Sequence, residues 1–453
     1  MTRAPAAAAA AAIAAIAAIV ALAGACRDGD GDVATVRFWA MGREGEVVTE
    51  LTAAFEREHP GVRVEVQQLP WLAAHEKLLT AFVGEATPDL AQLGNTWVPE
   101  LAALGALTPL DDVVSASQVV RKTDYFDGIW SANLAQGLAG GGAGGPALYG
   151  VPWYVDTRLL FYRRDLWREA TGSDEVPQTW AGWLDAMQKI AARGSGVPGG
   201  RYAILLPLDE FEQPLALALS QGEPLLRDGD RWGNFRSAGF RRALVFYLRL
   251  FAKGLAPMVT QVQASNPWHE LGRGYITSLI LGPWAIGELS RRLPAEQQES
   301  WGTAPLPGPA GPGTSLAGGS SLVIFRGAAH PREAWQLIEY LSRPEVQLRF
   351  YELMGNLPSR RTAWASPTLA GDERVRAFRE QLERVRSAPP VPEWERIATE
   401  LRVVTERAAR RVGPASTEAE LEAVAAEAAA ELDARVDAML EKRRWILSRR
   451  GAP

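Results

Sequence analysis

Few residues of this 453-residue chain have the spacing that covalent chemistry needs. The single Cys, Cys26, cannot form an internal disulfide, and four His without a Cys partner make a poor zinc site. The neighbouring carboxylates Asp111 and Asp112, or Asp209 and Glu210, could be imagined as the acid and base of a glycosidase. The sequence has no G-x-S-x-G or H-E-x-x-H motif. We therefore expect no enzyme, no metal and no other cofactor, and keep a glycoside-acting enzyme as the lesser alternative.

The composition favours binding of a neutral solute. Of all residues 47% are hydrophobic and 22% charged, which is typical of a folded protein with apolar surface to bury. The net charge of -5 argues against a nucleic-acid-binding surface. The 16 Trp supply many flat apolar faces, most of which we expect in the core, Trp167, Trp183 and Trp445 among them.

Residues 1–25 have the character of a secretory signal. Residues 4–25 carry no charge, follow Arg3 and end in small residues. The segment L-A-G-A-C at 22–26 resembles a lipobox, so we expect Cys26 to be lipidated and residues 26–32 to form a membrane tether. The alternatives are ordinary cleavage after Ala25, which leaves a free thiol, and an uncleaved membrane anchor.

Hydrophobic periodicity predicts alternating strands and helices after this tether. Strands are predicted at residues 33–40, 62–66 and 89–94, where apolar residues alternate with others or turn-forming residues bound a short apolar run. Helices are predicted around residues 47–55 and 78–83, where apolar residues recur every three or four positions. Asn95 or Thr96 is expected to cap a helix that ends at Gly105. Strands separated by such helices predict an α/β fold with a parallel or mixed sheet covered on both faces.

Similar signals mark the rest of the chain. The Gly-rich residues 137–146 lack the P-loop pattern and are interpreted as a surface loop. Residues 149–162 predict two extended segments, and the segment P-Q-T-W at 177–180 is expected to cap a helix that ends before Gly194. Thr417 and Glu420 have capping-box spacing at the start of an amphipathic closing helix.

Several segments, taken in order, resemble the extracellular solute-binding proteins of family 1, the carbohydrate-binding lipoproteins of ABC importers related to the maltose-binding protein. The resemblance covers residues 33 to about 400, and its specificity comes from the joint order of the segments. They are F-W-A at 38–40, P-D-L-A-Q-L-G-N-T-W at 88–97, Y-G-V-P-W-Y-V-D at 149–156, P-Q-T-W at 177–180, L-G-P-W at 281–284, A-G-G-S-S-L-V-I-F at 317–325 and G-N-L-P-S-R-R at 355–361.

This resemblance implies a class II type of periplasmic-binding-protein fold, with two lobes joined by chain crossings and a ligand cleft between them. Residues 33–155 and 304–358 would form lobe 1, and residues 157–303 and 359–453 would form lobe 2. A solute in such a cleft contacts both lobes only when they close, so it draws them together.

A sugar site needs aromatic plates for C–H faces and polar groups for hydroxyls. The resemblance places Trp153, Tyr154 and Trp284 as plates, with core packing as the alternative for each. It implies that polar side chains contact the sugar hydroxyls and that backbone N–H groups approach the sugar closely. Trp71 and His75 are weaker candidates for contact with the sugar. The expected polar and backbone contacts are Glu44, Asn95, Thr96, Asp156, Gly319, Ser320 and Arg360.

The function that this resemblance implies is that of the exported, substrate-binding component of an ABC importer. Its ligand would be a disaccharide or oligosaccharide, and its partners the permease subunits with their ATPase and a membrane reached through the lipid anchor. We expect a monomer that does not bind nucleic acid. The alternative solutes are a polyamine, whose site would show carboxylates clustered around aromatic rings, or a peptide.

Overall fold

The computed structural model describes residues 33–136, 145–197, 199–264 and 266–450. The signal segment, Cys26, the tether and most of the Gly-rich stretch lie outside the described residues. None of the helices in the described ranges is long and apolar enough to cross a membrane. The lobe boundaries given above stay a prediction, and we keep lobe 1 and lobe 2 as names for those residues.

Lobe 1 is built on a six-stranded mixed sheet, and the early strands are those that periodicity predicts. β1 pairs in parallel with β2 and β3, whereas β13 runs antiparallel to β3 and β6. The sheet order is β14-β6-β13-β3-β1-β2. The strands are β1 (Ala34–Met41), β2 (Val62–Leu69), β3 (Leu90–Gly94), β6 (Val151–Asp156), β13 (Gly318–Ile324) and β14 (Leu357–Pro358).

Helices cover both faces of this sheet, as expected for α/β packing. Val36 and Phe38 are buried in one cluster with residues of α2, and Ala91 and Leu93 in another with residues of α3 and α4. The helices are α2 (Glu44–Glu58), α3 (Trp71–Val83), α4 (Val98–Leu104), α5 (Asp111–Ala116), α6 (Asp127–Ser131), α14 (Pro331–Leu341) and α15 (Pro344–Met354).

The predicted helix start at Asn95 or Thr96 is wrong. A 3-10 turn, η1 (Asn95–Trp97), follows β3, and α4 begins at Val98. The Asn95 side chain does not cap the helix, because its Nδ2 donates to the Ala317 carbonyl at 2.9 Å. The predicted end is confirmed, since Gly105 follows α4 in the left-handed conformation at φ 78°.

Lobe 2 has a smaller sheet within a larger helical body. β7 (Leu159–Arg163) lies between β10 (Ser278–Leu281) and β11 (Trp301–Ala304), antiparallel to both. Two-residue strands pair as β8 (Leu226–Arg227) with β9 (Trp232–Gly233) in lobe 2 and as β4 (Leu134–Ala135) with β5 (Ala147–Leu148) in lobe 1. β12 (Ser315–Leu316) of lobe 1 pairs with β15 (Val385–Arg386) of lobe 2. The helices are α7 (Arg164–Thr171), α8 (Trp180–Ala192), α9 (Glu212–Leu219), α10 (Ala238–Ala252), α11 (Gln261–Ala264), α12 (Pro267–Gly272), α13 (Trp284–Arg292), α16 (Pro367–Ala370), α17 (Glu373–Leu382), α18 (Trp394–Ala409) and α19 (Glu418–Arg450).

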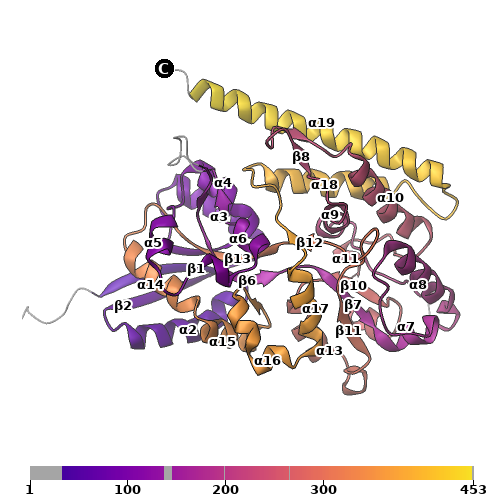
Figure 1. Cartoon of the computed structure of the whole chain (residues 1–453), viewed down its shortest axis with the longest axis horizontal. Coiled ribbons are helices and arrows are strands. Elements are labelled where there is room, and N and C mark those ends of the chain that lie inside the picture. The colour runs from indigo at the N-terminus through magenta and orange to yellow at the C-terminus, as the bar shows by residue number, and fades with distance from the viewer. Residues whose placement is uncertain (1–32, 137–144, 198, 265, 451–453) are drawn as a thin grey trace, which may run out of the picture.

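The closing helix α19 begins at the predicted capping box. Thr417 N donates to Glu420 Oε2 at 2.7 Å, and Glu420 N donates to Thr417 Oγ1 at 3.3 Å. Figure 1 shows α19 as one long helix that runs past α10 and α18. Trp167 and Trp183 are fully buried as predicted, but Trp445 near the end of α19 is 54% exposed, so its assignment to the core is wrong.

Candidate functional site

A cavity of about 310 Å³ lies in lobe 2, next to the first chain crossing at Asp156. β10 ends at Leu281, and Gly282 and Pro283 turn the chain into α13, whose first residue is Trp284. The Trp284 ring stays 37% exposed and meets the Trp268 ring edge-on, with the ring centroids 6.0 Å apart. The two rings therefore offer an apolar wall on one side of the cavity.

Charged side chains form another part of the lining and its surroundings. Arg158 Nη1 donates to Asp156 Oδ1 at 2.6 Å, and Arg158 Nη2 donates to Glu212 Oε1 at 3.0 Å. Glu210 accepts hydrogen bonds from the amides of Gln213 and Gln261. Burial, and then the charge of Glu212, raise the pKa of Glu210. The cavity thus combines aromatic rings with carboxylates and one guanidinium whose hydrogen bonds fix their directions.

Gly282 allows these two parts to approach each other closely. A Cβ at this position would collide with Asp156 Oδ1 and lie 2.8 Å from both Arg158 Nη1 and Trp284 Nε1. A side chain at 282 would therefore push the ion pair away from the indole. The structure brings the predicted residues Asp156 and Trp284 together on either side of this glycine.

Three other predicted residues form a hydrogen-bonded network within lobe 1. Tyr154 Oη donates to Glu44 Oε1 at 2.7 Å, and Ser320 Oγ lies 2.9 Å from Tyr154 Oη. Gln92 Nε2 donates to both hydroxyls at 3.1 Å, and Asn356 Nδ2 donates to Glu44 Oε1 at 3.4 Å. These contacts join residues between 62 and 312 positions apart, so the network fixes Glu44 at the start of α2.

Glu44 and Tyr154 are both buried in this network, with Glu44 7% and Tyr154 6% exposed. Burial raises the pKa of Glu44, and the hydrogen bonds from Tyr154, Trp71 and Asn356 oppose that rise. Burial also raises the pKa of Tyr154, as does the neighbouring charge of Glu44. In this structure the Tyr154 ring belongs to the core and exposes no free face.

The remaining residues at the crossings are Asn95, Thr96 and Gly319. Asn95 donates to the carbonyl of Ala317. Thr96 lies in η1, which contacts α18. Gly319 lies inside β13, opposite Val155 of β6. Its φ of 135° and a virtual Cβ that would collide with the Tyr154 carbonyl require glycine here.

Two predicted contacts are buried away from the cavity. The Trp153 ring is 1% exposed and stacks on Phe350 at 4.4 Å, because β6 is an interior strand with both faces covered. Arg360 is 4% exposed, and its Nη2 donates to Asp124 Oδ2 at 2.5 Å. Trp153 and Arg360 are thus core residues in this structure, and the expectation of direct contact with a solute is corrected for both.

Three residues that line the cavity, Trp268, Gln261 and Glu212, are not among those predicted from the sequence. Helix α12, which holds Trp268, is six residues long and starts with Pro267, and α11, which holds Gln261, has only four residues. Glu212 and Gln261 form hydrogen bonds with residues more than 50 positions away in the sequence, and no short sequence pattern predicts such contacts. Glu210 also lines the cavity, whereas the sequence suggests it only as half of a glycosidase pair with Asp209.

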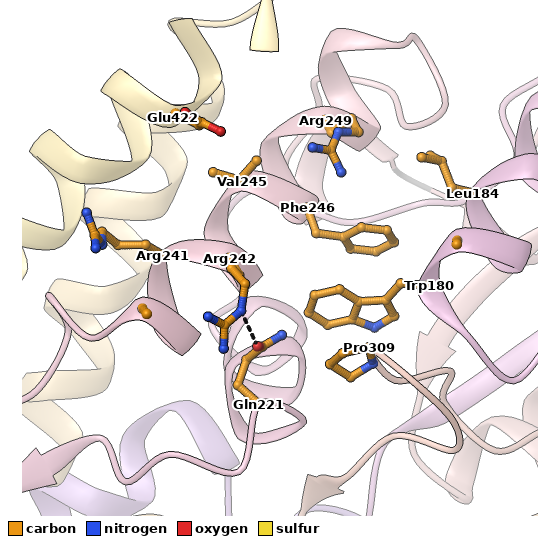
Figure 2. Close-up of a pocket in the computed structure, with 12 residues that line it drawn as sticks. Trp180, Leu184, Gln221, Arg241, Arg242, Val245, Phe246, Arg249, Pro309 and Glu422 are labelled. Carbon is orange, nitrogen blue, oxygen red and sulfur yellow. Dashed lines mark hydrogen bonds between the residues drawn. The ribbon is translucent and has the colours of Figure 1, made fainter. Parts of the chain in front are cut away.

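A second, larger cavity of about 670 Å³ lies between α8, α10 and α19 (Figure 2). The Trp180 ring is stacked on Phe246 at 4.4 Å and is only 8% exposed. Arg249 is paired with Glu418, and Arg242 Nε donates to Gln221 Oε1 at 3.0 Å. Because the Trp180 ring is covered, this cavity is a poorer sugar site than the one at Trp284, where the ring is 37% exposed. Across the described ranges no group of three or more His, Cys, Asp or Glu could hold a metal ion.

Comparisons with known proteins agree with this architecture. The family described as bacterial extracellular solute-binding protein matches residues 41–348. The structure of the sugar-binding protein MalE from Xanthomonas citri is 51% identical, covers 91% of this chain and 99% of its own, and has a TM-score of 0.83. A lipoprotein encoded in the oleD 5' region of Streptomyces antibioticus is 28% identical over 83% of this chain and 84% of its own length. The diacetylchitobiose-binding protein DasA of Streptomyces coelicolor is 23% identical over 74% of each chain.

The fold predicted from the sequence is confirmed by the match to the Xanthomonas citri protein, and the matched residues cover more than half of the chain. The chain therefore belongs to the bacterial extracellular solute-binding protein family.

Proposed function

We propose that this protein is the sugar-binding component of an ABC importer, and that it holds its sugar at the cavity beside Trp284. The observation that carries the proposal is the pairing of an exposed Trp284 face with the fixed polar groups Asp156, Arg158 and Glu212. Sugars have flat C–H faces that stack on indole rings and hydroxyls that need oriented acceptors and donors.

The relatives support the chemical class of the solute. The Xanthomonas citri protein is named a sugar-binding protein, and the Streptomyces coelicolor protein is named for a disaccharide. We infer a disaccharide or oligosaccharide for this chain. Thr96 and Asn95 from lobe 1 would complete the site when the lobes close, with Glu44 and Ser320 positioned behind it through Tyr154. The protein would then present the closed form to permease subunits and their ATPase, and turn over no substrate.

Lipid anchoring is part of the same proposal. Cys26 follows the signal segment, and one relative is named a lipoprotein. Acylation of Cys26 would hold the folded lobes at a membrane surface without a spanning helix.

A thermal-shift screen tests the choice of solute. Neutral disaccharides and oligosaccharides, polyols, polyamines and peptides are each added to the purified protein, because a ligand of the native state raises the unfolding midpoint. We expect a sugar to raise it. A shift with a polyamine alone would favour the second candidate, since Asp156, Glu210 and Glu212 lie close to the rings of Trp268 and Trp284.

A further inference from the structure

The cavity beside Trp284 carries an excess of negative charge. Arg158 is the only cationic side chain among the described residues that line it, and it donates to both Asp156 and Glu212, at 2.6 and 3.0 Å. Glu210 also lines the cavity, and it forms no ion pair with any residue that the structure describes. One guanidinium is therefore shared by two carboxylates, and a third carboxylate has no cation within ion-pair distance.

Two neutral amides fix the direction of the Glu210 carboxylate. Gln213 Nε2 donates to Glu210 Oε2, and Gln261 Nε2 donates to Glu210 Oε1 at 2.5 Å. Gln213 is only 1% exposed, and its other amide atom, Oε1, is buried with no hydrogen-bond partner in the described part of the chain. An ionised carboxylate offers about four lone-pair positions, of which these amides occupy two. Glu210 is thus oriented without being neutralised, and it keeps positions for further donors.

The electrostatic surroundings of Glu210 agree with this geometry. Burial, and then the charge of Glu212, raise the pKa of Glu210, while the two amides and the charge of Arg158 oppose that rise. A raised pKa of a carboxyl group means that its surroundings disfavour the ionised form. A ligand cation beside the carboxylate would reverse this effect, because an opposite charge within about 4–6 Å favours ionisation.

The aromatic wall of the cavity suits a ring that carries a positive charge. The Trp284 ring is 37% exposed and meets Trp268 edge-on. An indole face packs against the C–H faces of a sugar and also attracts an ammonium group through the negative face of its π-system. Because both rings and Glu210 line the same cavity of about 310 Å³, one small ligand contacts an indole and this carboxylate together.

We propose that the sugar of this protein is an amino sugar, whose ammonium group binds to Glu210 while its ring stacks on Trp284. The ammonium donates hydrogen bonds to the free positions of the Glu210 carboxylate, and the ring hydroxyls bond to Arg158 and Glu212. This inference rests on the function proposed above, since it names the class of sugar for the same cavity. A polyamine fits less well, because it repels the Arg158 guanidinium and has no hydrogen-bond acceptor for it.

Matched pairs of sugars test the proposal in the parent protein. Each pair differs only in whether C2 carries an amine or a hydroxyl: glucosamine and glucose, galactosamine and galactose, mannosamine and mannose, and the β-1,4-linked disaccharides of glucosamine and of glucose. Isothermal titration calorimetry at pH 6.5, where the amine is protonated, gives the Kd of each. We expect the amine to bind about tenfold to a hundredfold more tightly in at least one pair, as is typical of a hydrogen bond to a charged group. The N-acetyl form of that sugar, which keeps the nitrogen without its charge, should lose this gain.

Three variants assign the preference for the amine to Glu210. Glu210→Gln removes the charge and should bring the two members of the preferred pair to within about twofold in Kd, whereas Glu210→Asp keeps the charge and should retain part of the preference. Asp209→Asn is the matched control, because Asp209 is adjacent but does not line the cavity. Its Oδ1 accepts from Gln261 N at 2.7 Å, and the asparagine oxygen preserves that bond. This variant should keep the full preference of the parent.

The outcomes separate this inference from the function on which it rests. If hydroxyl sugars bind and the amine binds no more tightly in any pair, the amino-sugar assignment is overturned while sugar binding stands. A folded Glu210→Gln variant that keeps the full preference would overturn the role of Glu210. If no member of any pair binds, the inference is overturned, and the thermal-shift screen decides separately whether the sugar-binding function falls with it.

Discussion

Replacing Trp284 by alanine should weaken sugar binding strongly while leaving the fold intact. The side chain keeps 37% of its surface exposed at the cavity. For a side chain of roughly 250 Å², this is about 90 Å² of largely apolar surface that a sugar can cover. At about 25 cal/mol per Å², covering it contributes about 2 kcal/mol, which corresponds to about a 30-fold increase in Kd for the Trp284→Ala variant.

Isothermal titration calorimetry with the sugar that gives the largest thermal shift measures this change. Trp445→Ala is the matched control, because Trp445 is 54% exposed but lies on α19 outside the cavity, and its affinity should equal that of the parent. Trp284→Phe should lose less than the alanine variant, since a smaller ring remains. An alanine variant that unfolds at the same temperature as the parent and binds with unchanged Kd would refute the reasoning.

Three further predictions concern the anchor and the lobe 1 network. Cys26→Ser should move the protein from the membrane to the soluble fraction after cell fractionation, and continued attachment would indicate an uncleaved helix. Gly319→Ala should lower the free energy of unfolding by about 1–3 kcal/mol or more in denaturant titrations, because alanine is strained at this φ and its Cβ meets the Tyr154 carbonyl. Tyr154→Phe should cost about 1–3 kcal/mol at neutral pH by leaving Glu44 without its hydroxyl donor. That loss should shrink as the pH falls through the raised pKa of Glu44, and a loss that is independent of pH would contradict the role given to the hydrogen bond.

Local patterns were sufficient to predict much of the fold. The apolar alternation in β1 and β2 and the helical spacing in α2 reflect burial against neighbours that are close in sequence. The start of α4 was mistaken because Asn95 satisfies a carbonyl of Ala317, a residue 222 positions away, in place of its own helix. A short sequence pattern cannot show that the Asn95 side chain bonds to the Ala317 carbonyl rather than to the N–H groups at the start of its own helix.

The candidate site was harder to predict for the same reason. Trp153 and Asp156 lie on one strand, but the first packs on Phe350 and the second reaches Arg158 at the crossing. Which aromatic ring remains exposed depends on whether the strand is interior or at an edge, and this is a property of the whole sheet.

A crystal structure of the protein with its sugar tests the central claim most directly. We expect electron density for the sugar ring against Trp284, with hydroxyls within hydrogen-bond distance of Asp156, Arg158 or Glu212 and with the lobes closed over it. Density for the sugar in the cavity at Trp180 and Arg242 instead, with the site at Trp284 empty, would contradict it.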